Sequence, residues 1–114
     1  SNDFSLDRFA LSDSIGDEWG CMGDEVICQT KPRLHISGSC STQPEEVISI
    51  QLIRCGEVIK VFEVKGLKFD IEFEDDYFRP EEKIYYRLNI TSPHSIIVSN
   101  PIFVKFSRSH DEAL

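Results

Sequence analysis

The sequence predicts an all-β protein that folds as an immunoglobulin-like or fibronectin-like antiparallel β-sandwich of about seven or eight strands. Apolar and polar residues alternate through most of the chain, which is typical of strands that bury one face. Turn-forming residues recur at intervals of roughly 8–12 residues, and no useful length of the chain has helical periodicity. The 114 residues suit one domain with a single core.

Residues 1–19 lack clear periodicity, and their aromatic side chains are scattered among acids, serines and glycines. Ser1-Asn2 resembles the scar that remains when a tag is cleaved off. We expect this segment to be a tag remnant followed by a linker or docking segment, with at most one helical turn. The β-sandwich domain is then predicted over residues 20–107, and a polar tail over residues 108–114.

The predicted strands cover residues 25–29, 32–38, 47–55, 58–64, 67–74, 84–91, 95–98 and 101–106. Pro32 can open a strand, because its missing N–H is tolerated at a strand start. Gly56 lies in a tight turn between two strands and can take a positive φ there. Pro101 separates the last two strands, since it cannot donate to the ladder. The alternation predicts an inward face made of Leu34, Ile36, Ile48, Ile50, Leu52, Phe69, Ile71, Phe73, Tyr86, Leu88 and Ile90.

The charge of the chain limits its partners. Its formal net charge is −8, which argues against nucleic acid or an anionic membrane surface, because both attract a basic face. Acids concentrate in residues 1–30 and 70–82, and we interpret both clusters as solvated surface rather than as a cation site. No apolar run approaches the ~18 residues that cross a bilayer, and we expect no signal peptide within these residues.

The four cysteines are Cys21, Cys28, Cys40 and Cys55. None forms a C-x-x-C pair, so a structural zinc site is not expected. Cys40 and Cys55 fall near opposite ends of one predicted hairpin, which makes them poor disulfide partners. We expect free thiols in a reducing cytosol, with a disulfide framework as the alternative.

No catalytic or metal-binding constellation is visible. His35, His94 and His110 are dispersed along the chain, and none has a second ligand at metal-binding spacing. The acids of residues 72–76 lack the alternation of a calcium loop. We therefore expect no catalytic residue, no metal and no cofactor in this chain.

Four segments in order resemble a known domain. They are G-C-M-G-D-E-V over residues 20–26, I-S-I-Q-L-I-R-C-G-E-V over residues 48–58, Y-Y-R-L over residues 85–88 and I-I-V-S-N-P-I-F-V over residues 96–104. Together they resemble the C-terminal β-sandwich that follows the metal-dependent catalytic barrel in PHP-superfamily (polymerase and histidinol phosphatase) phosphoesterase-like proteins. The resemblance spans roughly residues 20–105.

This resemblance implies a non-catalytic accessory domain of a metal-dependent hydrolase. The metal ligands of the family belong to its barrel and have no counterpart here, so no catalytic residue is carried over. The implied role is to pack on the PHP-like catalytic domain of the same polypeptide, to shape the rim of its active site or to join subunits in a homo-oligomer. The candidate interface residues are Trp19, Met22, Tyr85, Asn100 and Pro101.

A free-standing fibronectin-like, carbohydrate-binding or protein-binding module is the alternative function. It predicts an exposed aromatic patch around Tyr77, Phe78 and Tyr85, on which a sugar ring could stack. The alternation of the strand over residues 84–91 places Tyr86 inside and leaves Tyr85 outside.

Overall fold

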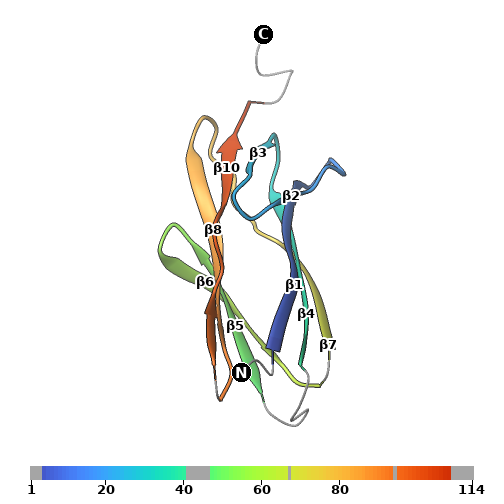
Figure 1. Ribbon diagram of the computed structural model, residues 1–114. Helices are drawn as coiled ribbons and strands as arrows, with labels where there is room; N and C mark the ends of the chain where they lie inside the picture. The colour runs from blue at the N-terminus through green and yellow to red at the C-terminus, as the bar shows by residue number, and fades with distance from the viewer. Residues whose placement is uncertain (1–3, 41–46, 67, 94, 109–114) are drawn as a thin grey trace.

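The computed structural model describes residues 4–40, 47–66, 68–93 and 95–108, and these form strands and connections without any helix. Two sheets pack face to face, which confirms the predicted sandwich (Figure 1). The strands are β1 (Phe4–Asp13), β2 (Gly20–Cys21), β3 (Glu25–Cys28), β4 (Pro32–Cys40), β5 (Ile48–Arg54), β6 (Glu57–Val64), β7 (Lys68–Glu74), β8 (Lys83–Thr91), β9 (Ile96–Val98) and β10 (Ile102–Phe106).

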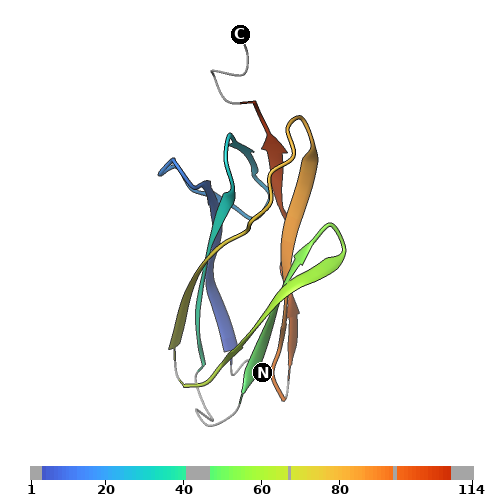
Figure 2. The ribbon, with the colours of Figure 1, turned by 180° about the vertical axis from the view of Figure 1, so that it is seen from behind.

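The smaller sheet has the strand order β2-β1-β4-β7 and is antiparallel throughout. The larger, six-stranded sheet has the order β3-β10-β8-β5-β6, with β9 also paired to β8. Its only parallel pair within the described residues is β3 with β10. After β2 the chain crosses from the four-stranded sheet to the six-stranded one, and β3 is added to the edge beside β10 (Figures 1 and 2).

The core lies between the two sheets and follows the predicted alternation. The inward residues predicted on β4, β5 and β8 are all buried, and Phe9, Leu11, Cys28, Ile102, Val104 and Phe106 join them. Phe69, Ile71 and Phe73 also pack against this core, but they are only partly buried because β7 lies at the edge of its sheet.

The expectation of a linker over residues 1–19 is wrong for residues 4–13, which form β1 in the interior of the four-stranded sheet. The suggested helical turn is absent there, because β1 pairs with β4 along its length. The residues Phe9–Ser12 are buried on both faces, and the pairing shifts between Leu6 and Arg8. Both features remove the alternation that identifies a strand. The suspected tag scar and residues 109–114 of the tail lie outside the described residues.

Two turns have the predicted backbone geometry or position. Cys55 and Gly56, which form the loop between β5 and β6, have positive φ angles of 51° and 87°. A two-residue hairpin loop favours such angles, because its twist then matches the twist of the two strands. Pro101 falls between β9 and β10, as predicted from its missing donor.

A buried polar cluster fixes the connection between β7 and β8, which crosses from one sheet to the other (Figure 2). The carboxylate of Asp75 accepts hydrogen bonds from Arg54 Nη1 at 2.7 Å and from the Tyr86 hydroxyl at 2.5 Å. The guanidinium of Arg54 also lies 4.0 Å from the centre of the Tyr77 ring. Two strands of the six-stranded sheet thereby hold the start of the crossing segment.

Candidate functional site: the outer face of the six-stranded sheet

The outer face of the six-stranded sheet exposes an unusual number of large apolar side chains. The alternation of side chains along each strand fixes their outward direction, as with Phe103 between the buried residues Ile102 and Val104. We call this surface the apolar face. Its exposed members are Ile27, Val58, Val61, Ile96, Val98 and Phe103.

The apolar face extends across the sheet from one strand to the next. Phe103 of β10 lies directly opposite Tyr85 of β8. Farther along β8, Asn89 pairs with Val98 on one side and with Gln51 on the other, and Gln51 in turn pairs with Val61. Side chains at such paired positions are neighbours on one face, so the exposed apolar residues share this face, where polar side chains such as Asn89 and Gln51 lie between some of them.

Four of the five predicted interface residues lie close together, around the connection between β9 and β10 and the neighbouring part of β8. The backbone N–H of Gly23 donates to the carbonyl of Pro101 at 2.8 Å, which places the turn containing Met22 beside the Asn100-Pro101 kink. Met22 and Asn100 are exposed, and Pro101 is partly buried. Tyr85 follows one strand away, opposite Phe103. The sequence alone does not place these segments side by side.

Trp19 lies on the other sheet. Its ring is 5.3 Å from the guanidinium carbon of Arg8, 5.1 Å from that of Arg33 and 6.2 Å from the ring of His35. These residues surround Ala10, which faces outward yet is fully buried, so the indole covers the outer side of β1 at this small residue. Trp19 thus packs within the domain and is separate from the apolar face.

The predicted aromatic patch is not assembled in the structure. Tyr77 and Phe78 are partly buried, and their ring centres lie 5.8 Å and 5.2 Å from that of Phe106 in the core. Tyr85 faces outward on the opposite side of the six-stranded sheet. The three rings therefore do not form one stacking surface.

The outer face of the four-stranded sheet has a different chemistry. Its edge strand β7 presents Asp70, Glu72 and Glu74, all of which are exposed. Asp70 Oδ1 lies 2.6 Å from Nε2 of His35 on the neighbouring strand. His94 and His110 lie outside the described residues. The two outer faces of the sandwich therefore differ. On one, the acids of β7 lie beside basic residues such as Arg33 and Lys68, and on the other, exposed apolar side chains are mixed with polar ones.

The sheet edges are poorly suited to pairing with another chain. On β6 the register shifts between Leu52 and Ile53 of the neighbouring strand, which marks a bulge, and Lys60 lies on the inner side opposite Leu52. Bulges and inward-pointing lysines are devices that prevent edge-to-edge association. The edge strand β7 has a charged residue at every second position, and the edge strand β3 is short, with only four residues. Contact with another protein is therefore favoured at a face rather than at an edge.

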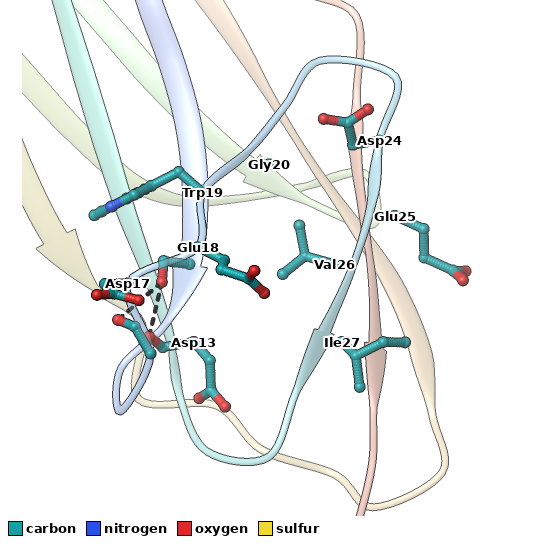
Figure 3. A pocket seen from close by; sticks show the side chains of 11 residues that line it. Asp13, Asp17, Glu18, Trp19, Gly20, Asp24, Glu25, Val26 and Ile27 are labelled. Atoms are coloured by element: carbon teal, nitrogen blue, oxygen red, sulfur yellow. Dashed lines mark hydrogen bonds between the residues drawn. The ribbon is translucent and has the colours of Figure 1, made fainter.

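An acidic hollow of about 670 Å³ lies between the β1–β2 connection and β3 (Figure 3). Glu18 and Val26 face each other across it, whereas Glu25 and Ile27 point away on the far side of β3. The Asp13 carboxylate is already used, because it accepts hydrogen bonds from the backbone N–H groups of Gln29 and Thr30 at 2.9 Å and 3.1 Å. In the part of the chain that the structure describes, no group of three or more metal-ligating side chains is assembled.

Three cysteines are free thiols, and the side chain of Cys40 lies outside the described residues. Cys21 and Cys55 are exposed. Burial, with a smaller contribution from the nearby Asp13 carboxylate, raises the pKa of Cys28 to about 12. The Cys28 thiol therefore stays protonated and unreactive at neutral pH.

Comparison with known proteins adds no assignment: no family model matches the chain, and no curated protein matches it. Among the described residues, no helix has the length and apolar character needed to cross a membrane.

The outward apolar residues of the short strands are not evident from the sequence pattern. Ile27, Val98 and Phe103 lie in runs where apolar residues follow one another, so the period of two is hidden. The signal that could have found them is the continuation of the inward set: once Ile102 and Val104 are placed in the core, Phe103 must face solvent.

Proposed function

We propose that this chain is a non-catalytic accessory domain that acts by protein contact through the apolar face. The observation that carries the proposal is the group of exposed apolar side chains on the outer face of the six-stranded sheet. Exposed apolar side chains that gather on one face, with polar residues around them, commonly mark interaction sites.

The parent protein in this proposal is a PHP-like metal-dependent phosphoesterase. The support is the resemblance of the four segments between residues 20 and 104 to the sandwich that follows the catalytic barrel in that family. Catalysis then belongs to the barrel, and this domain packs on it or holds subunits together. The free, exposed thiols of Cys21 and Cys55 support a reducing compartment such as the cytosol.

Carbohydrate binding is the weaker alternative. A sugar-binding platform needs aromatic rings that share an exposed surface. Tyr77 and Phe78 instead pack on Phe106, so only Tyr85 remains on an outward face.

The proposal is tested by comparing this chain with the longer polypeptide that carries the catalytic domain. Oxidative footprinting reports the solvent access of individual side chains in both forms. At concentrations low enough for the short chain to be monomeric, we expect Met22 and Phe103 to be protected in the long form only. Glu72, on the outer face of the four-stranded sheet, should be unchanged. Bound metal and hydrolysis of a generic phosphoester are expected in the long form only. Equal labelling of Met22 and Phe103 in both forms, or hydrolysis by the short chain, contradicts the proposal.

A further inference from the structure

We infer that the apolar face joins two copies of this chain about a two-fold axis, with Phe103 at the centre of the contact. The inference rests on the proposed function, because it assigns a partner to the same face. It depends on how charged residues are arranged around Phe103, and on the surfaces that the rest of the chain leaves available.

The charged residues beside Phe103 are of opposite sign and lie on a diagonal. Phe103 is directly opposite Glu25 across the β3–β10 pair, and Lys105 is opposite Ile27 in the same pair. Glu25 and Ile27 point outward from β3 (Figure 3). Neither Glu25 nor Lys105 has an ion-pair partner in the described ranges of the chain. An open hollow of about 330 Å³ lies among Glu25, Ile27 and Lys105.

This diagonal makes the patch complementary to itself. Strands lie about 4.8 Å apart, and residues that share a face follow at about 6.8 Å along a strand, so Glu25 and Lys105 occupy two opposite corners of a small rectangle. A two-fold axis in the plane of contact, midway between them, places each Glu25 opposite the other copy's Lys105. The other two corners, Phe103 and Ile27, then lie beside the axis and meet their own copies. An isologous interface requires this kind of self-complementarity.

The charge of the whole chain favours the same surface for two identical copies. A net charge of −8 makes two copies repel each other over most of their surfaces. The exposed acids of β7, Asp70, Glu72 and Glu74, are unfavourable for contact with their own copies. Lys83 and Lys105 lie directly opposite each other on the apolar face, so the local charge there is less negative. The repulsion between two copies on this face is therefore smaller than the net charge of the whole chain implies.

The experiment is a sedimentation-equilibrium concentration series on this chain, with reductant present so that the exposed thiols cannot cross-link copies. We expect a reversible dimer. Glu25→Lys and Lys105→Glu each place like charges opposite each other, so either one should weaken dimerisation on the order of tenfold. The double variant E25K/K105E exchanges the pair and should return the dissociation constant close to that of the unmodified chain. Lys68→Glu, on the far sheet, is the matched charge control and should have little effect.

The charge exchange distinguishes this geometry from any other association. A chain that is monomeric at every concentration overturns the inference, and so does a double variant as weak as its two singles when circular dichroism shows that all variants are folded. If the chain is monomeric while Met22 and Phe103 are still protected in the longer polypeptide, the second copy is wrong and the proposed accessory role stands. If neither result is obtained, both proposals fail.

Discussion

The hydroxyl of Tyr86 offers a quantitative test of the buried polar cluster. Tyr86 is fully buried, and its O–H donates to the Asp75 carboxylate, which is 6% exposed. A hydrogen bond to a charged group contributes about 1.5–3 kcal/mol. In Tyr86→Phe the Asp75 carboxylate loses one hydrogen bond but keeps the one from Arg54. Only part of the free-energy cost of burying its charge is therefore left without compensation. We therefore expect the free energy of unfolding to fall by about 2 kcal/mol.

The assay is urea denaturation at neutral pH, followed by the fluorescence of Trp19. Tyr85→Phe is the matched control, because Tyr85 is the adjacent residue, faces outward and makes no hydrogen bond through its hydroxyl within the described residues. It should change stability by less than about 0.5 kcal/mol. A loss below about 0.5 kcal/mol for Tyr86→Phe would show that the hydroxyl does not support the carboxylate and that the cluster is wrongly assigned.

The pH dependence gives a second reading of the same substitution. Burial, followed by the hydrogen bond to Asp75, raises the pKa of Tyr86 above its ordinary value of about 10. The unfolded chain therefore loses this proton first, and the stabilisation, complete below about pH 10, declines above it by about 1.4 kcal/mol per pH unit. We expect the stability difference between the unmodified chain and Tyr86→Phe to shrink between about pH 10 and pH 11. A constant difference would contradict the raised pKa.

Three further predictions concern the core, one close backbone contact and the thiols. Ile50→Ala should lower the free energy of unfolding by about 2–5 kcal/mol in urea denaturation, whereas Val61→Ala on the outer face should change it by less than about 1 kcal/mol; similar losses would mean that the strand register is wrong. Gly38→Ala should lower the melting temperature, since its Cβ would lie 2.5 Å from a carbonyl oxygen of β1, and an unchanged value would refute that close approach. Under native conditions near pH 8, Cys55→Ser should remove one rapidly reacting thiol in a thiol-titration assay and Cys28→Ala should remove none; a loss with Cys28→Ala would show that its thiol is accessible.

The strands that the alternation of the sequence predicts correctly are those that expose one face to solvent. β8 alternates along its length, and β5 alternates as far as Leu52, because their inner sides lie in the core and their outer sides are more accessible to solvent. β1 is different, because Trp19 from the following connection covers its outer side at Ala10. The period of two depends on solvent at one face, so a strand covered on both sides loses it. The contact that hides β1 is itself tertiary, and no local pattern contains it.

The candidate site also could not be predicted from local sequence patterns, because it depends on contacts between segments that are distant in the sequence. Met22 and Pro101 are nearly eighty positions apart in the sequence, and they become neighbours only because β3 pairs in parallel with β10. That parallel register also sets Glu25 opposite Phe103 and thereby creates the diagonal with Lys105. A parallel edge strand that follows a crossing from one sheet to the other has no local signature in the sequence, because neither a hairpin turn nor an alternating run marks it. The sequence can therefore predict which short segments form strands, but the self-complementary arrangement of charge and apolar surface emerges only when the crossing after β2 is known.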